Sequence, residues 1–288
     1  MKNNLAVIIL NYNSYDDTLK LINSIEQYDP GYSIIVVDNF YDNMERQKVL
    51  QLQERCTLIF LEENNGYAAG NNAGIKKALE LGCETFLLAN SDTCIIKPNS
   101  ISDCYSYMKK NHIGILGPKM INEAEEDISG CIKVDKFGRT SHLYTDEIKE
   151  CMSLTGAFIL IDKSVIEKIG YIREFYFLYR EETDYCIRAF NNQVKIVFYP
   201  VVTILHKSGV TTKNVADYYY NRNMFIFSRE IYNTNTLKLA LFYFFRYVLQ
   251  SLRILKNERA GKVASRKFKQ IWLAYFDGVK DVRGKRQL

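Results

Sequence analysis

The first third of the chain alternates short apolar runs with stretches of helical length, and this alternation constrains the fold more than any other feature. Four runs are rich in β-branched residues and have the length of buried strands: residues 5–10, 33–37, 57–61 and 84–89. The stretches of helical length are residues 14–28, 43–55 and 71–81. Strand–helix alternation is typical of βαβ units, so it predicts a Rossmann-like, three-layer α/β fold with a mostly parallel sheet.

Short polar side chains follow each of these four runs. The polar segments are residues 11–13 (Asn-Tyr-Asn), 38–39 (Asp-Asn), 63–65 (Glu-Asn-Asn) and 90–92 (Asn-Ser-Asp). Ligands of open parallel sheets bind beyond the carboxyl ends of the strands, so we expect a ligand site at these segments. Ser14 and Asp17, just after the first segment, are spaced as a capping box for the first helix.

After Pro98 the pattern becomes irregular. We expect strands at residues 114–121, 129–134, 154–161, 194–199 and 201–205. We expect helices at residues 101–110, 164–169 and 181–191, and a loop over the polar residues 135–150. These elements are expected to complete one domain, residues 1–216, with halves at about 1–97 and 98–216.

Residues 217–288 are expected to form a separate helical region rich in basic and aromatic residues. Residues 237–255 are long enough to span a bilayer, but Lys238, Arg246 and Arg253 interrupt them, and a central arginine is costly in hydrocarbon. An amphipathic helix at a membrane interface fits this pattern better, with a second one at residues 268–276. Helices packed on the domain are the alternative, and dimerisation through this region stays open.

The formal charge of the chain conceals an asymmetry. The total is +5, yet residues 238–288 carry 13 Lys and Arg against three Asp and Glu, a net charge of +10. The remaining residues 1–237 therefore carry 25 basic and 30 acidic residues, a net charge of −5. We expect the acidic body to bind no nucleic acid, and residues 237–288 to meet an anionic membrane surface.

Cysteine usage and the N-terminal residues bear on the compartment. The seven cysteines form no CxxC pair, and their number is odd, so we expect reduced thiols in a cytosolic protein. The apolar run at residues 5–10 is too short for a signal peptide or a membrane span. The expected location is cytoplasmic, peripheral at the inner face of the plasma membrane.

Several polar residues could carry chemistry, and each also has a structural interpretation. Asp38 could bind a nucleotide, or it could occupy a turn. Asp92 is a hard oxygen ligand suited to Mg²⁺ or Mn²⁺, although a lone turn Asp is more often a helix cap. His206 could be a metal ligand or a base, although a single histidine is more often structural.

Three carboxylates crowd one turn at residues 181–184. Like charges this close raise one another's pKa, which favours a proton acceptor, although acids at a helix start are also stabilised by the helix dipole. Glycines 66, 70 and 74 could let a phosphate approach the start of a helix, but their spacing is neither GxGxxG nor a P-loop, and close packing of the helix on the sheet explains them better.

Taken in order, these residues resemble the inverting family 2 glycosyltransferases with the GT-A fold. The resemblance covers about residues 7–229 and rests on Val7–Asn13, Val36–Asn39, Asn64–Asn72, Asn90–Thr93, Thr155–Ala157, Phe177–Tyr185 and His206. The rhamnosyltransferase-like subgroup of bacterial polysaccharide synthesis, which builds capsule, O-antigen and cell-wall polymers, is the most similar. It implies an enzyme that moves a sugar from a UDP- or dTDP-sugar to a hydroxyl of a lipid-linked or polysaccharide acceptor.

The resemblance also implies a role for each matched residue. The nucleotide-binding half, 1–97, would hold the donor through Asn11, Asn13, Asp38, Asn65, Gly66, Asn71 and Ser91. Asp92 and His206 would hold the Mn²⁺ or Mg²⁺ ion. In the acceptor-side half, Glu182 would be the catalytic base, Glu181 and Asp184 would shape the acceptor site, and Gly156 and Tyr179 would flank the donor sugar and acceptor.

Two positions depart from the family pattern. Asn90 stands where many members have the first Asp of a DxD motif, which lowers the expected metal affinity. Glu182 stands where Asp is more common, which moves the acceptor oxygen about one methylene away. Asn90 supports an alternative, a catalytically silent nucleotide-binding or scaffold subunit of a polysaccharide synthesis complex. A Rossmann-type NAD enzyme fails because the first strand leads into Asn-Tyr-Asn and not into a glycine fingerprint.

Overall fold

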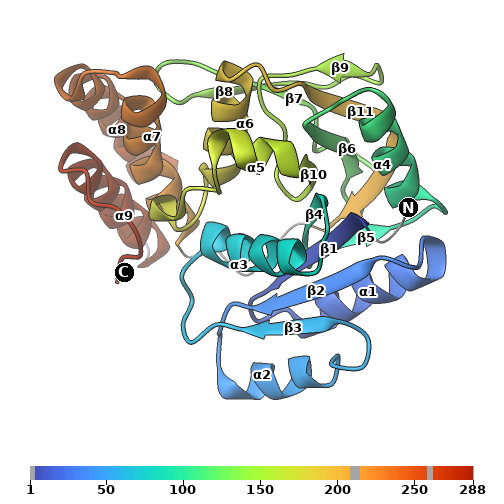
Figure 1. Cartoon of the computed structure of the whole chain (residues 1–288). Coiled ribbons are helices and arrows are strands. Elements are labelled where there is room, and N and C mark those ends of the chain that lie inside the picture. The colour runs from blue at the N-terminus through green and yellow to red at the C-terminus, as the bar shows by residue number, and fades with distance from the viewer. Residues whose placement is uncertain (1–3, 208–214, 258–261, 288) are drawn as a thin grey trace.

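The computed structural model describes residues 4–207, 215–257 and 262–287 (Figure 1). Its first four strands confirm the expected parallel units, and they are β1 (Leu5–Asn11), β2 (Ser33–Asp38), β3 (Thr57–Phe60) and β4 (Thr85–Asn90). Their pairing is parallel throughout, with Asn11 opposite Asp38 and Leu10 opposite Asn90. This register brings the polar strand ends to one edge of the sheet, as predicted.

The second half of the chain extends the same sheet. The strand order is β3-β2-β1-β4-β10-β6-β11-β5. The added strands are β5 (Thr93–Ile95), β6 (Ile115–Ile121), β10 (Phe158–Asp162) and β11 (Ile196–His206). Among the strands of this order, β10 and β5 oppose the common direction, so the sheet is mostly parallel; the short β9 (Lys149–Glu150), which pairs with β11 alone, also runs antiparallel. The two strands expected at 194–199 and 201–205 form the single β11, whose register shifts between Tyr199 and Thr203, beside Pro200, which has no N–H to donate.

The loop expected at residues 135–150 is wrong. It contains β8 (Thr140–Leu143), which pairs with β7 (Cys131–Val134), and β9 (Lys149–Glu150), which pairs with β11. The side chains of β8 are mostly exposed, so the strand shows no apolar periodicity, and its backbone pairing holds it in place.

Helices cover both faces of the sheet. On one side pack α1 (Tyr15–Tyr28) and α4 (Ser100–Lys110), with α2 (Asn43–Leu50) beside α1. The other face is covered by α3 (Tyr67–Glu80), α5 (Lys163–Ile169) and α6 (Glu181–Asn191). Alternate residues of β1 enter the two cores: Val7 and Ile9 face one, and Ala6 and Ile8 face the other. Burial on both faces explains why the strands read as continuous apolar runs.

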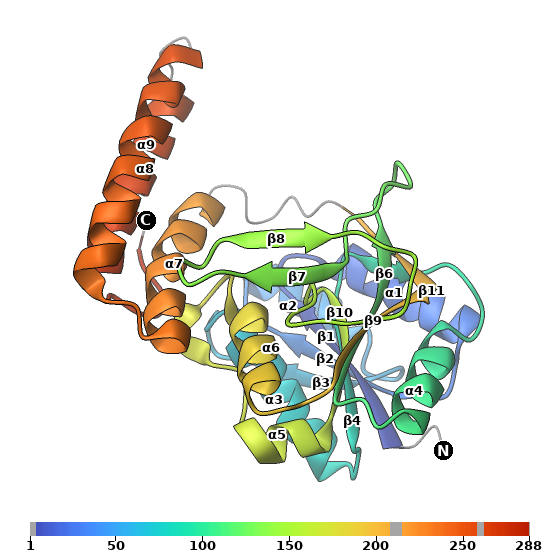
Figure 2. The same cartoon turned by 90° about the horizontal axis from the view of Figure 1, so that it is seen from above.

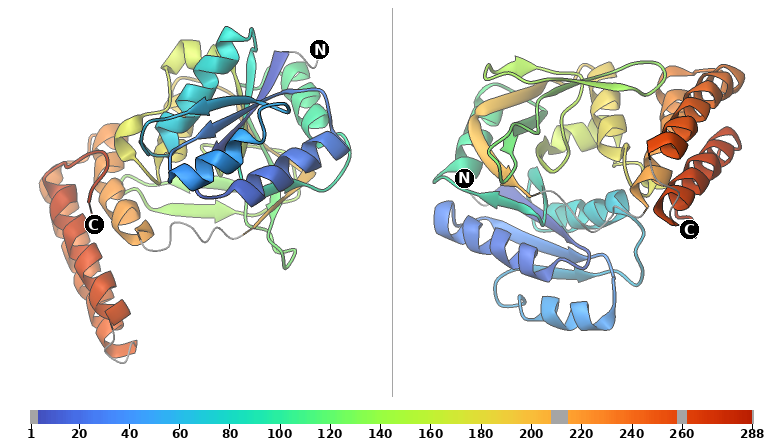
Figure 3. Two further views of the ribbon diagram at one scale, coloured as in Figure 1. Left: turned by 90° about the horizontal axis from the view of Figure 1, so that it is seen from below. Right: turned by 180° about the vertical axis from the view of Figure 1, so that it is seen from behind.

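Three helices follow the sheet, and they are α7 (Ala216–Tyr232), α8 (Thr236–Asn257) and α9 (Lys262–Val279). The expectation of helices at 237–255 and 268–276 is confirmed, and α7 falls in the region 217–288 that was expected to be helical, although no separate helix was assigned there. Figures 2 and 3 show α8 and α9 side by side, projecting away from the sheet, with α7 between them and the sheet. Among the described residues, no helix is long and apolar enough to cross a membrane.

Two of the seven cysteines are paired, which corrects the expectation of reduced thiols. Cys131 and Cys151 form a disulfide with their Cα atoms 5.3 Å apart, and the other five cysteines, all within the described residues, form no disulfide. The chain around Cys151 lies beside β7, where the Ile132 N–H donates to the Ser153 carbonyl at 2.9 Å. This contact joins segments about twenty residues apart, so cysteine spacing gave no sign of it.

Candidate active site

A cleft of about 1160 Å³ opens at the carboxyl ends of β1 and β4. Eight of the residues singled out from the sequence line it: Gly66, Ser91, Asp92, Gly156, Tyr179, Glu181, Glu182 and His206. They come from five separate segments of the chain. The fold therefore gathers these residues, from both halves of the sheet, around one space.

Asp92 and His206 face each other across two antiparallel strands. His206 pairs with Thr93 in the β5–β11 ladder, and the Lys207 N–H donates to the Asp92 carbonyl at 2.9 Å. His206 Nε2 lies 3.3 Å from Asp92 Oδ1. No hydrogen bond within the described residues reaches Asp92 Oδ1 or His206 Nδ1.

This pair offers one carboxylate oxygen, a ligand that suits both Mn²⁺ and Mg²⁺, and one imidazole nitrogen, which suits Mn²⁺ better than the harder Mg²⁺. The described part of the chain holds no group of three or more His, Cys, Asp or Glu placed to bind a metal. Mg²⁺ sites of this kind are commonly completed by substrate phosphates and water. The residues present therefore fit a divalent ion that arrives with a phosphate ligand.

Glu182 depends on a glycine for its position. A Cβ atom on Gly156 would lie 2.7 Å from both Cβ and Cγ of Glu182, closer than real Cβ contacts allow. Tyr67 holds the same turn, since its hydroxyl donates to the Gly156 carbonyl at 2.9 Å. The Thr-Gly-Ala segment thus gives Glu182 the room to reach the cleft.

The two glutamates at the start of α6 share a poorly solvated position. Burial raises the pKa of Glu182. Burial, and then repulsion from Glu182, raise the pKa of Glu181 well above its usual range. Glu181 Oε2 also has no hydrogen-bond partner among the described residues. Raised pKa values in a cleft are characteristic of groups that accept and release protons near neutral pH.

Asp184 does not line the cleft, contrary to its expected place in the acceptor site. It is fully buried, and its carboxylate lies 3.1 Å from Arg173 Nη1 and 2.7 Å from Arg188 Nε. The Tyr176 hydroxyl donates to it at 3.1 Å. Asp184 therefore braces α6 against the segment that precedes it.

Five residues expected to hold the donor nucleotide also lie outside the cleft lining: Asn11, Asn13, Asp38, Asn65 and Asn71. Asp38 is fully buried, 2.9 Å from Arg46 Nε, and Asn71 donates to the Tyr67 carbonyl within its own helix at 3.0 Å. The side chains of Asn13 and Asn65 are exposed.

Asn11 and Ser14 instead organise the strand end. Asn11 Oδ1 accepts from Thr18 Oγ1 at 3.0 Å and from Ser14 Oγ at 3.3 Å. The predicted capping box is wrong, because Ser14 makes no side-chain cap and accepts a hydrogen bond from Ser91 Oγ at 2.9 Å. Ser14 thus ties the start of α1 to the cleft residue Ser91.

The aromatic wall at the end of the cleft next to β1 was not predicted from the sequence. Tyr12 and Tyr41 line it with ring centroids 5.4 Å apart, edge to face. Asn39 and Asn64 stand beside them, joined by a hydrogen bond from Asn39 Nδ2 to Asn64 Oδ1 at 3.1 Å. The sequence offered one signal for this wall: Tyr12 lies between Asn11 and Asn13, which were both expected to hold the donor.

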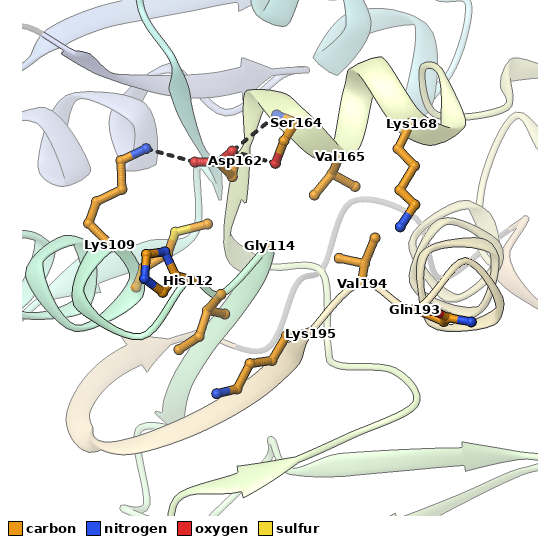
Figure 4. Close-up of a pocket in the computed structure, with 12 residues that line it drawn as sticks. Lys109, His112, Gly114, Asp162, Ser164, Val165, Lys168, Gln193, Val194 and Lys195 are labelled. Atoms are coloured by element: carbon orange, nitrogen blue, oxygen red, sulfur yellow. Dashed lines mark hydrogen bonds and ion pairs between the residues drawn. The ribbon is translucent and has the colours of Figure 1, made fainter.

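A second, smaller pocket of about 410 Å³ lies at the opposite edge of the sheet, where β6 and β11 begin (Figure 4). It is lined by Lys168, Lys195 and His112, and by Lys109, which pairs with Asp162 at 2.7 Å. None of the residues singled out from the sequence lines this pocket.

Comparison with known proteins finds relatives that match most of this chain. The low-salt glycan biosynthesis hexosyltransferase Agl10 of Haloferax volcanii is 28% identical over 247 residues, which cover 81% of this chain and 78% of that protein. The dTDP-rhamnosyl transferase RfbF of Shigella flexneri is 24% identical over 301 residues, covering 99% and 98%.

Solved structures share the fold at low sequence identity. S. aureus TarS 1-349 in complex with UDP-GlcNAc superposes with a TM-score of 0.59 at 17% identity, covering 95% of this chain and 73% of that one. GalNAc-T7 with UDP, GalNAc and Mn²⁺ gives 0.60 at 11% identity, covering 72% of this chain, which spans only 44% of that structure. Residues 6–170, more than half of the sequence, match glycosyl transferase family 2. The chain belongs to this family and is a glycosyltransferase with the GT-A fold.

Proposed function

We propose that this glycosyltransferase moves a sugar from a UDP- or dTDP-sugar to a hydroxyl of a lipid-linked or polysaccharide acceptor, with inversion at the anomeric carbon. The observation that carries the proposal is that Glu182 and the Asp92–His206 pair line one cleft. The relatives add support, because one is named a hexosyltransferase and another a dTDP-rhamnosyl transferase.

In the proposed reaction, Glu182 accepts the proton of the acceptor hydroxyl while that oxygen attacks the anomeric carbon. The bond between that carbon and the diphosphate oxygen breaks, and its electron pair leaves with the diphosphate. The raised pKa of Glu182 suits a base working near neutral pH, a contribution typically worth about 10²–10⁴-fold. One displacement needs no covalent nucleophile and inverts the configuration.

Asp92 and His206 would hold a divalent cation, Mn²⁺ or Mg²⁺, which as a Lewis acid stabilises the charge growing on the leaving diphosphate. Tyr12 and Tyr41 offer aromatic surface to the nucleobase at the other end of the cleft. Asn11 and Asp38 are fully buried, so they would affect donor binding indirectly, by fixing the ends of β1 and β2.

The test compares Asp92→Asn and Glu182→Gln with Glu167→Gln, an exposed acid on α5. With a panel of UDP- and dTDP-sugars, Glu182→Gln should lower transfer by about 10²–10⁴-fold. Asp92→Asn should remove the response to added Mn²⁺, while nucleotide binding and thermal unfolding persist. Full transfer in either variant would overturn the site assignment.

Asn90 supports a second candidate function, that of a catalytically silent nucleotide-binding or scaffold subunit. It lines the cleft beside Asp92 and supplies an amide where a second carboxylate would strengthen a metal site. Hydrolysis of a nucleotide sugar by the wild-type protein with Mn²⁺ would exclude this alternative.

Residues 1–216 would thus form the catalytic unit, and α8 and α9 would hold it at an anionic membrane surface such as the cytoplasmic leaflet. The support is an apolar stripe of exposed side chains on one face of α8: Leu237, Leu241, Phe244, Phe245, Leu249 and Leu252. Lys238, Arg246 and Arg253 are exposed along one edge of this stripe. Apolar side chains flanked by cations match the arrangement of interfacial helices.

A further inference from the structure

The last residues of the chain return to the cleft. After α9 the backbone turns back along α7, where the Gly284 N–H donates to the Phe175 carbonyl at 2.7 Å. Arg222 Nη1 donates to the Gly284 carbonyl at 2.7 Å, and the Arg286 N–H donates to the Tyr219 hydroxyl at 2.9 Å. Arg222 and Tyr219 are both buried, so the returning segment is anchored on the core of the helical region.

This return places two cations in the cleft wall, Lys285 and Arg286. The other lining side chains that can carry charge are mainly acids: Asp17, Glu63, Asp92, Glu123, Glu181 and Glu182. The cleft cation Lys207 already lies 3.6 Å from Asp17. An anionic ligand therefore meets repulsion from most of the cleft wall and attraction at the returning segment.

The two cations differ in how they are held. Arg286 Nε lies 3.2 Å from Asp277 Oδ2, and Asp277 also accepts from the Tyr218 hydroxyl at 2.6 Å. This contact orients the guanidinium, which has five N–H donors in total. Lys285 is exposed and makes no ion pair within the described residues, so its ammonium is available to a ligand.

We propose that Lys285 and Arg286 form an anion subsite that binds phosphoryl oxygens of a ligand in the cleft. A compact ammonium beside a planar guanidinium is a pairing suited to phosphate oxygens. The proposal rests on the proposed function, which supplies two sources of this chemistry: the diphosphate of the donor and the phosphate of a lipid-linked acceptor.

The experiment measures binding by calorimetry to wild type, to the Lys285→Ala/Arg286→Ala variant, and to the control Lys280→Ala. Lys280 is an exposed cation of the same segment that does not line the cleft. The probes are UDP and uridine with dTDP and thymidine for the donor, and farnesyl diphosphate and farnesol for the acceptor. Lys285→Gln alone serves if the double variant unfolds, because Lys285 has no ion pair to lose.

A loss of about ten- to a hundredfold in affinity for UDP or dTDP, with the nucleosides unchanged, would assign the subsite to the donor. The same loss confined to farnesyl diphosphate, with farnesol unchanged, would assign it to the acceptor. Affinities within twofold of Lys280→Ala for every diphosphate would overturn the subsite. Wild type that binds no nucleotide would contradict the proposed function, and the subsite is then judged with inorganic pyrophosphate on the same three proteins.

Discussion

The sheet-containing body and the α8–α9 hairpin use their apolar residues in opposite ways. In the body, successive residues of β1 enter cores on both faces of the sheet. In α8, Leu239, Tyr243 and Tyr247 pack toward α7 and α9, while the apolar stripe stays exposed. The strands of the body are thus covered on both faces, and α8 presents an apolar surface that can still be covered.

Within the body, the acids of the interior and of the cleft are held differently. The buried carboxylate of Asp184 is matched by two arginines. In the cleft lining, the buried polar atoms that have no hydrogen-bond partner among the described residues include Asp92 Oδ1, His206 Nδ1 and Glu181 Oε2. Buried polar groups are almost always satisfied in folded proteins, so we expect a ligand in the cleft to meet these three atoms.

The largest effect on stability is expected from Asp184→Ala. It removes the buried acceptor of Arg173, Arg188 and the Tyr176 hydroxyl, but Arg173 keeps Glu230 and Arg188 keeps two backbone carbonyls, so we expect a loss of about 1.5–3 kcal/mol of unfolding free energy. The matched control is Glu167→Ala, which removes an exposed pair with Lys163 worth about 0–1 kcal/mol. Urea denaturation measures both. Equal midpoints for the two variants would show that Asp184 does not brace the body.

Gly156→Ala tests whether the cleft depends on close packing. The new methyl group would lie 2.7 Å from Glu182 Cβ, so the carboxylate must shift. Displacement of a catalytic group by about 1 Å can cost about 10²-fold in rate, and we expect a loss of that order with KM little changed. Steady-state kinetics measure it. Undiminished kcat would contradict the proposed role of Glu182 as the catalytic base.

Leu241→Glu/Leu249→Glu tests the exposed stripe of the hairpin. Both side chains are more than half exposed, so the fold should tolerate the change while binding to anionic vesicles weakens by about tenfold or more. Co-sedimentation with phosphatidylglycerol vesicles measures it, with Leu81→Glu, an exposed leucine of the body, as control. Unchanged sedimentation of the double variant, together with a dimer that becomes a monomer, would favour self-association.

The sequence predicted the body better than the cleft, for physical reasons. The strands were visible because both of their faces are buried, whereas β8 is exposed and α7 mixes buried Tyr, Asn and Arg without an apolar period. Asp92, His206 and Glu182 could be singled out because metal binding and proton transfer restrict the residue type, and all three line the cleft. Asp38 and Asp184 share that type, but each meets an arginine that only folding brings close, Arg46 and Arg173, whereas the i,i+4 pair of Asp184 with Arg188 was visible in the predicted helix.

The smallest expected effect is a gain in stability from Glu181→Gln. The pKa of Glu181 is raised in the folded state by burial and by Glu182, so the folded protein binds the proton more tightly than the unfolded chain. Stability therefore falls as pH rises from the ordinary carboxyl pKa through the raised one, and the neutral amide avoids this loss. We expect Glu181→Gln to raise Tm by about 2–4 °C at pH 7 and by less at pH 4, measured by thermal unfolding. A gain of the same size at both pH values would mean that ionisation of Glu181 does not destabilise the folded protein. The contrast between the unmatched acids of the cleft and the paired acids of the interior would then lose its support.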